Sequence, residues 1–183
     1  MKHLGTVLIE TERLRLRPLT LSDTQAMYDN WANDVDVSRY VTWETHANSE
    51  ETAELMAFWC QQYDQPNFYN WGIEIKETGE LIGTFTFVSL SERDLVAELG
   101  YCIGQQWWNK GYVTEAGKAL LDFGFQQLGL NRIEAIHDVR NPASGRVMEK
   151  LGMSYEGTMR QIRKVKGQFV TVKPYSILAK ENH

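Results

Sequence analysis

The chain has 183 residues, of which 43% are hydrophobic and 23% charged, and a formal net charge of −5. This length suits one domain with a sizeable core. The acidic balance argues against a general nucleic-acid binder, which would show a basic face, and no apolar run approaches the length that crosses a bilayer. The N-terminus lacks the apolar core and cleavage site of a signal peptide. We therefore expect one cytoplasmic domain, residues 1–183, that binds neither nucleic acid nor membrane directly.

The cysteines and histidines form no recognisable metal or redox pattern. Cys60 and Cys102 lack the spacing of either kind of site, so we expect two buried or half-buried thiols in a reducing compartment. A disulfide between them is the alternative. The four histidines form no H-x-x-x-H pair and no cluster with cysteine, so no metal site is expected.

The first third of the chain predicts a strand and then two helices. Arginine and leucine alternate over residues 12–19, and a period of two indicates a strand with one solvated face. A helix follows and runs to about Asn33. The next helix begins near Asn48 or Ser49, with glutamates in its first turn, where the helix dipole favours them. Its apolar stripe, which we expect to pack into the core, consists of Leu55, Met56, Trp59 and Tyr63.

Three strands are predicted next, at 69–76, 81–89 and 95–103, with Gly79 free to take a positive φ in the first turn. A helix over 114–128 and a short apolar strand over 132–139 complete this part of the chain.

Another helix opens at Asn141-Pro142, a good cap followed by a good first residue. Residues 153–179 then indicate two long strands that turn near Lys166 and Gly167. A strand meander followed by alternating helices and strands gives a mixed sheet covered by helices. The fold class is therefore α/β (α+β).

The segment AELGYCIGQQWWNKGYVTEA, residues 97–116, carries the clearest sign of chemistry. A strand runs into a glycine-containing loop that opens a helix. The N–H groups at a helix start are unpaired and the dipole is positive there, which suits a phosphate or pyrophosphate. Gly111 would allow close approach of the backbone. The alternative is an ordinary connection that happens to contain a glycine. The segment is neither a P-loop nor a G-x-G-x-x-G fingerprint.

The segment NPASGRVMEKLGM, residues 141–153, reads by itself as a well-capped amphipathic helix. Together with A-E-L-G-Y at 97–101 and W-N-K-G-Y-V-T-E-A at 108–116, it resembles the GNAT superfamily of N-acetyltransferases, and most closely the RimJ/RimL-like (ribosomal-protein N-acetyltransferase-like) branch. The resemblance covers nearly the whole chain. It implies a mostly antiparallel sheet of about seven strands with four main helices, splayed at an acetyl-CoA cleft. It also allows a homodimer.

The resemblance further implies a set of acetyl-CoA-binding residues. The backbone of Tyr101, Cys102 and Ile103 would pair with the pantetheine arm. Asn141 would reach the same arm, and Ser144 would lie near the sulfur. The family's pyrophosphate loop commonly has the pattern R/Q-x-x-G-x-G/A. This chain departs from it at the first position, Trp108, and at the last, Val113, and similar departures occur elsewhere in this branch. That loop and the helix start after it comprise Trp108, Asn109, Lys110, Gly111, Tyr112, Val113 and Thr114.

Acetyl transfer to an amine needs a base and an acid. Glu98 lies in the otherwise apolar strand V-A-E-L-G-Y, where partial burial would raise its pKa into a useful range. We expect it to act as the general base; the alternative is a carboxylate at the rim, in water. Ser144 is the candidate for returning a proton to the thiolate, and Tyr155 is a less favoured acid.

Two further groups of residues have open roles. Tyr40, Trp43 and Phe68 lie in or beside segments where this family builds its acceptor pocket, so they either line a cleft or pack in the core. The basic cluster near the last hairpin reads as a solvated edge that discourages strand pairing, and contact with an acidic partner or the nucleotide is the alternative. It consists of Arg160, Arg163, Lys164 and Lys166. The acceptor is a protein N-terminus or a small amine, and a non-catalytic acyl-CoA sensor is the competing function.

Overall fold

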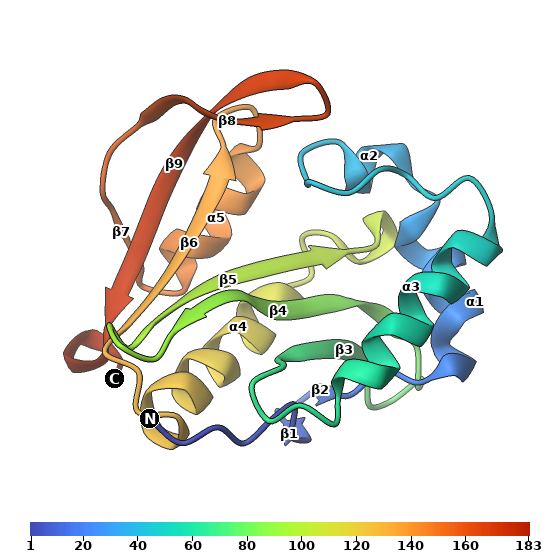
Figure 1. Ribbon diagram of the computed structural model, residues 1–183, viewed down its shortest axis with the longest axis horizontal. Coiled ribbons are helices and arrows are strands. Elements are labelled where there is room, and N and C mark those ends of the chain that lie inside the picture. Colours follow the sequence, from blue (N-terminus) through green and yellow to red (C-terminus); the bar gives the residue numbers. More distant parts are fainter.

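The computed structural model describes residues 1–183 and contains one mixed sheet (Figure 1). The strands lie in the order β1-β2-β3-β4-β5-β6-β9-β7, and β8 pairs with β9. All neighbouring strands are antiparallel except β5 and β6. The strands are β1 (Ile9–Glu10), β2 (Leu14–Arg17), β3 (Asn70–Ile75), β4 (Leu81–Ser91), β5 (Val96–Ile103), β6 (Arg132–Asp138), β7 (Ser154–Tyr155), β8 (Met159–Val165) and β9 (Gln168–Leu178).

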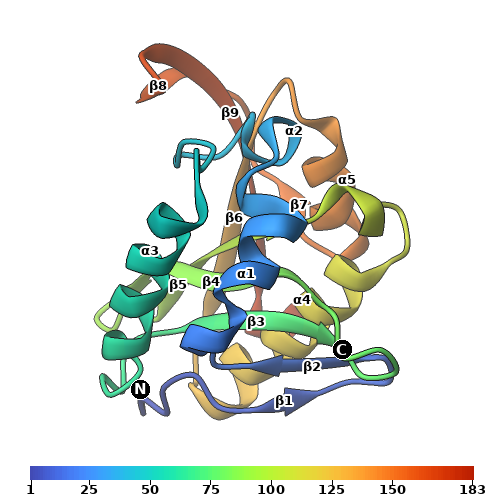
Figure 2. The ribbon, with the colours of Figure 1, turned by 90° about the vertical axis from the view of Figure 1, so that its right-hand side faces the viewer.

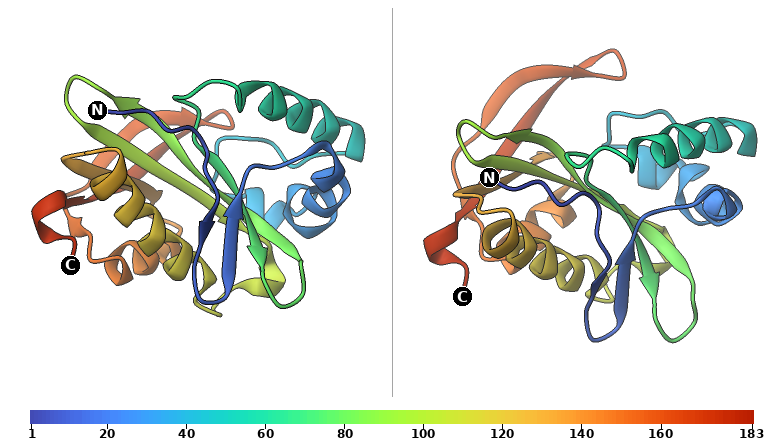
Figure 3. Two further views of the ribbon diagram at one scale, coloured as in Figure 1. Left: turned by 90° about the horizontal axis from the view of Figure 1, so that it is seen from below. Right: turned by 60° about the horizontal axis from the view of Figure 1, so that its bottom comes forward.

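Helices cover both faces of this sheet. Figure 3 shows α1 and α3 on the side opposite to α4, and Figure 2 shows α2 above α1, near the β8–β9 hairpin. The helices are α1 (Thr24–Met27), which continues as a π-helical turn over Tyr28–Ala32, α2 (Val35–Ser38), α3 (Ser49–Gln62), α4 (Tyr112–Asp122), which continues as a π-helical turn over Phe123–Gln127, and α5 (Pro142–Lys150). No helix has the length and apolarity that a bilayer crossing requires.

Most predicted elements are confirmed to within two residues at their ends. Two strands add to the seven expected, β1 and β7, and both have two residues, too few to produce a recognisable alternation. The helix expected from Thr114 begins two residues earlier, at Tyr112, because Gly111 takes φ +81° and caps it. Gly79 has φ +71°, as its turn requires. Cys60 and Cys102 are free, half-buried thiols.

An aromatic cluster holds β3 and β4 against the end of α4. The ring of Trp71 is fully buried and lies 5.7 Å from that of Phe87 and 5.6 Å from that of Phe123, edge to face in both cases. Its indole Nε1 donates to the Val7 carbonyl at 2.7 Å, which also fixes the N-terminal segment to the sheet. Edge-to-face packing of this kind adds to the stabilisation from burial.

Strands β5 and β6 part within the sheet. Their parallel pairing runs only from Val96–Arg132 to Leu99–Ala135. Beyond that point β5 remains paired with β4, and β6 remains paired with β9. The sheet is therefore splayed, as expected, and the open wedge lies next to the starts of α4 and α5.

Replacing Trp71 with alanine should lower the free energy of unfolding by about 3–5 kcal/mol, the usual cost of removing a large buried aromatic ring. Urea denaturation measures this. The same change at Phe169, which is 66% exposed, should stay within about 0.5 kcal/mol of the parent. Equal losses at the two positions would show that the cluster around Trp71 is not a stabilising core.

Candidate active site

Two cavities adjoin where β5 and β6 part. The helix-end cavity, of about 660 Å³, lies between residues 105–114 and the first turns of α5. The aromatic cavity, of about 400 Å³, lies between the sheet and the segments that carry α1, α3 and residues 40–46. Six residues line both cavities: Tyr40, Val41, Tyr101, Cys102, Asn141 and Ser144. Molecules bound in the two cavities would therefore meet at these residues.

The start of α4 presents unpaired backbone N–H groups to the helix-end cavity. Gly111 and Asn109 have φ values of +81° and +61°, so the loop doubles back immediately before the helix. The first helical bond of this turn runs from the Glu115 N–H to the Gly111 carbonyl. The amides of residues 112–114 therefore have no partner within the helix, and they form an anion-binding surface.

A carboxylate on α4 braces this loop against the turn between β1 and β2. Glu115 accepts hydrogen bonds from the Thr11 hydroxyl at 2.6 Å, the Arg13 backbone N–H at 2.8 Å and Arg13 Nε at 2.6 Å. Burial acts to raise the pKa of Glu115, but these hydrogen bonds outweigh it and lower the pKa. Arg13 also donates from Nη1 to the Lys110 carbonyl at 3.1 Å and covers the Tyr112 ring.

The helix-end cavity is locally basic in an acidic protein. Arg146 and Lys150, one turn apart on α5, line it and form no ion pair, whereas Arg140 is held by Asp138 at 2.6 Å. Sequence reasoning missed Arg146 and Lys150, although their i, i+4 spacing on the helix after Asn141 was a usable signal. A cavity with two free cations and exposed amides favours an anionic ligand.

A hydroxyl pair bridges the wedge between β5 and α5. The Tyr101 hydroxyl lies 2.8 Å from Ser144 Oγ and donates to the Ser144 carbonyl at 3.1 Å. Burial raises the pKa of Tyr101 to about 12, although the hydrogen bond to Ser144 acts the other way, so the phenol stays protonated. Asn141 caps α5 by accepting from the Ser144 N–H at 3.4 Å.

The open edge of β5 faces the same wedge. The Gly104 N–H donates to the Ile82 carbonyl at 2.9 Å, so in this antiparallel pair the backbone groups of Tyr101 and Ile103 point away from β4. Trp108 Nε1 donates to the Ile103 carbonyl at 2.9 Å. The backbone of Tyr101 is thus left to pair with a ligand, while the Ile103 carbonyl already has a partner.

The aromatic cavity takes its walls from several helices and loops. Tyr40, Trp43 and Phe68 line it, which agrees with the first of the two alternatives, lining a cleft rather than only packing in the core. Trp31 and Trp59 line it as well. The stripe on α3 was expected to pack into the core. Met56 does so with no exposed surface, whereas Leu55 and Trp59 also face this cavity.

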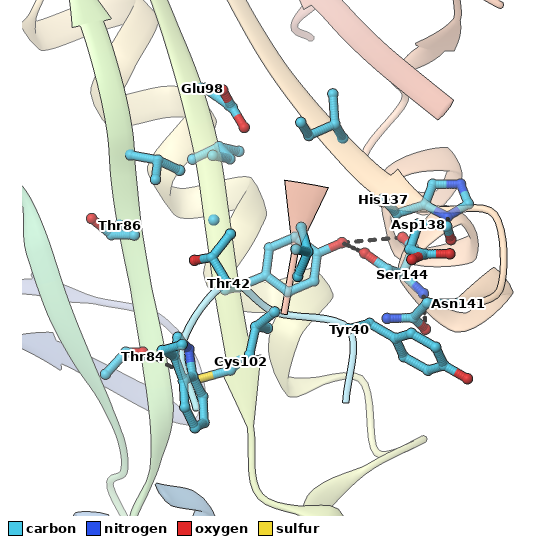
Figure 4. Close-up of a pocket in the computed structure, with 18 of the residues that line it drawn as sticks. Tyr40, Thr42, Thr84, Thr86, Glu98, Cys102, His137, Asp138, Asn141 and Ser144 are labelled. Carbon is cyan, nitrogen blue, oxygen red and sulfur yellow. Dashed lines mark hydrogen bonds between the residues drawn. The ribbon is translucent and has the colours of Figure 1, made fainter. Parts of the chain in front are cut away.

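Glu98 lies on β5 and lines the aromatic cavity, half-buried. Burial raises its pKa, Glu134 on β6 adds to this effect, and Arg163 on β8 opposes it. Figure 4 shows Glu98 near the top of the view and Ser144 lower and to the right, beside Asp138 and Asn141. Glu98 stands three residues from Tyr101 along the strand, roughly 10 Å, which is too far for direct contact and leaves room for a substrate group and a water molecule between them.

The remaining predicted residues divide between the two cavities and the surface. Every predicted coenzyme-binding residue lines the helix-end cavity except Lys110, whose carbonyl bonds to Arg13. Tyr155 lines neither cavity and bonds through its hydroxyl to Thr158 at 2.7 Å. Within the basic cluster, Arg163 lines the aromatic cavity. No three His, Cys, Asp or Glu side chains gather as a metal-binding group.

Comparison with known proteins gives the family. The acetyltransferase (GNAT) domain model matches residues 13–154. The chain is 34% identical over 171 residues to the uncharacterized N-acetyltransferase YoaA of Bacillus subtilis, covering 93% of this chain and 96% of that protein. It is 33% identical over 125 residues to the putative ribosomal N-acetyltransferase YdaF of the same organism. That alignment covers 67% of this chain and 66% of YdaF. The crystal structure of an acetyltransferase (GNAT family) from Bacillus anthracis superposes on this chain with a TM-score of 0.84 at 28% sequence identity. The superposition covers 96% of this chain and 100% of that one.

The chain therefore belongs to the GNAT family and is an N-acetyltransferase of the RimJ/RimL type. Members of this family use acetyl-CoA. The predicted fold, family and enzyme class are confirmed, and the enzyme reading replaces the alternative of a non-catalytic sensor.

The environment of Glu98 can be tested without any substrate. Its pKa is raised above the ordinary value of 4.5, so ionised Glu98 costs stability at neutral pH, and this cost disappears below about pH 4.5, where both states are protonated. Glu98→Gln should be more stable than the parent at pH 7 and equal to it near pH 4, by urea denaturation at both pH values. A less stable variant at pH 7 would mean that the carboxylate is well solvated or paired.

Proposed function

We propose that the two cavities hold the two substrates of one transfer. The helix-end cavity binds acetyl-CoA, and the aromatic cavity binds a primary amine that receives the acetyl group. The observation that carries the proposal is their shared lining at Tyr101, Asn141 and Ser144, because a direct transfer requires the thioester and the amine to meet. Both a protein N-terminal α-amine and a small amine satisfy this chemistry. The name of YdaF, a putative ribosomal N-acetyltransferase, favours a ribosomal acceptor.

The coenzyme is held by complementary charge and by backbone pairing. We expect its pyrophosphate to bind the amides of residues 112–114, and Arg146 and Lys150, which line the same cavity, to neutralise phosphate charge. Its pantetheine arm pairs with the open edge of β5 at Tyr101, and Asn141 contacts the arm beside it.

The base is needed because the nucleophile must be neutral. Deprotonating a free lysine amine, whose pKa is about 10.4, costs roughly 4–5 kcal/mol at pH 7. Deprotonating an α-amine, whose pKa is near 8, costs only about 1.4 kcal/mol. Glu98 takes this proton through a water molecule, which its position in the aromatic cavity and its raised pKa support. A well-placed base contributes about 10²–10⁴ in rate.

The leaving thiolate requires a proton in return. The Tyr101 hydroxyl has one proton, which it can donate to the Ser144 carbonyl at 3.1 Å or to Ser144 Oγ at 2.8 Å. When that proton turns to Ser144 Oγ, the proton of Ser144 is free to turn toward the sulfur. Ser144 is therefore the donor, and Tyr101 positions it and can replenish its proton. The Tyr101 hydroxyl does not ionise at neutral pH by itself, since burial raises its pKa to about 12.

Gly111→Val should weaken acetyl-CoA binding by about tenfold or more, because a side chain in the loop keeps the ligand from the backbone. Isothermal titration calorimetry measures the affinity. Gly79→Val is the matched control, since Gly79 has a similar φ of +71° in a turn where an added Cβ meets nothing within 4 Å. Both variants should lose similar stability. Unchanged affinity in a folded Gly111→Val protein would place the phosphates elsewhere.

Glu98→Gln should lower kcat by about 10²-fold near neutral pH, with little change in acetyl-CoA affinity, because the lost interaction belongs to the transition state. Free-thiol release measured against pH with one confirmed acceptor gives the result. The acidic limb of the profile should vanish, and residual activity should rise with pH as the amine deprotonates unaided.

Two neighbours of Glu98 provide controls of opposite sign. Glu134 raises the pKa of Glu98 and Arg163 lowers it, so Glu134→Gln should move the acidic limb to lower pH and Arg163→Gln should move it to higher pH. A limb that stays in place in both variants, or full turnover in Glu98→Gln, would assign the base to another group.

A further inference from the structure

We infer that the acceptor is a small monoamine with a flat apolar body, in preference to a polyamine or the N-terminus of a folded protein. This inference rests on the proposed function, because it takes the aromatic cavity as the acceptor site. Three properties of the cavity carry it: its walls, its charges and its closure by the last hairpin.

The walls favour a flat apolar body. Four aromatic side chains line the cavity from the segment after α2, from α3 and from the stretch just before β3: Tyr40, Trp43, Trp59 and Phe68. The residue beside Trp43 in space is His46, whose ring packs against it edge to face at 5.9 Å, so the indole is held in place. Aromatic faces that are preformed in this way bind planar apolar groups through burial and ring stacking.

The charges favour one amine rather than several. Among the lining residues only Glu98 and Asp138 carry a carboxylate. Asp138 is held by Arg140 at 2.6 Å, so Glu98 alone is free for the acceptor. The cation in the lining is Arg163. A second ammonium group would find no free carboxylate and would lie near a positive charge, which makes its burial costly.

The closure favours a small molecule. Lys166, in the turn between β8 and β9, donates to the Ser38 carbonyl at 2.7 Å and lies 3.8 Å from Glu44. This contact ties the hairpin to the segment that supplies Tyr40 and Trp43, and Figure 1 shows the hairpin reaching toward α2. A cavity of about 400 Å³ under this tie suits a small amine, whereas the N-terminus of a folded protein would have to thread beneath the hairpin.

The test compares three acceptors with acetyl-CoA by free-thiol release: 2-phenylethylamine, spermidine and an eight-residue peptide whose α-amine is free. The value of kcat/KM should be at least tenfold higher for 2-phenylethylamine than for the other two. A preference for spermidine or for the peptide, or acetylation of none of the three, would overturn the inference and leave the proposed function standing. A failure of the protein to bind acetyl-CoA would overturn the proposed function itself.

Trp43→Ala should raise the KM for 2-phenylethylamine about tenfold and leave acetyl-CoA affinity unchanged, while Trp43→Phe should restore most of the loss, because a ring is still present. Phe58→Ala is the matched control, since Phe58 is 53% exposed on α3 and lines neither cavity. Equal KM values for 2-phenylethylamine in Trp43→Ala and Phe58→Ala would show that the aromatic wall does not bind the acceptor and would overturn the inference.

Discussion

The parting of β5 and β6 after Leu99 and Ala135 is the constraint on which the site depends. Each strand keeps one partner, so the sheet stays continuous on both sides of the wedge while backbone groups along β5 lose theirs. A buried, unpaired amide costs about 1–3 kcal/mol, so such an edge is stable only when water or a ligand pairs with it. The hydrogen bond between Tyr101 and Ser144 fixes the width of the wedge. The sheet thereby provides an edge to which an extended polar ligand can add.

Rigid elements place the groups around that wedge. Glu98 is on a strand with partners on both sides, Glu134 on β6 and Ser89 on β4, and Ser144 is in the first turn of α5. The loop before α4 contains one short 3-10 helix, Gln105–Trp107, and its last residues are held by Arg13, which bonds to both Glu115 and the Lys110 carbonyl. Groups held by such contacts lose little freedom when substrates bind, which is how precise positions are maintained.

Charge separates the two cavities. The protein is acidic overall, yet the helix-end cavity has two unpaired cations, Arg146 and Lys150. The aromatic cavity has one free carboxylate, Glu98, whose pKa is set by burial and by charges on two other strands. In the proposed function, a highly anionic coenzyme and an amine would be directed to opposite sides of the same wedge by these local fields rather than by net charge.

The sequence by itself determined the order of the elements and the local motifs. The cap at Asn141 and the turn at Gly111 depend on neighbours within a few residues, so alternation and turn chemistry were enough to find them. The contacts that complete the site join distant residues: 43 positions separate Tyr101 from Ser144, and 128 separate Ser38 from Lys166. The approach of Arg163 to Glu98, and the turning of Leu55 and Trp59 toward a cavity as well as the core, follow only from strand order and helix placement. Periodicity shows which face of an element is apolar but not what that face will meet, so only the tertiary structure decided these contacts.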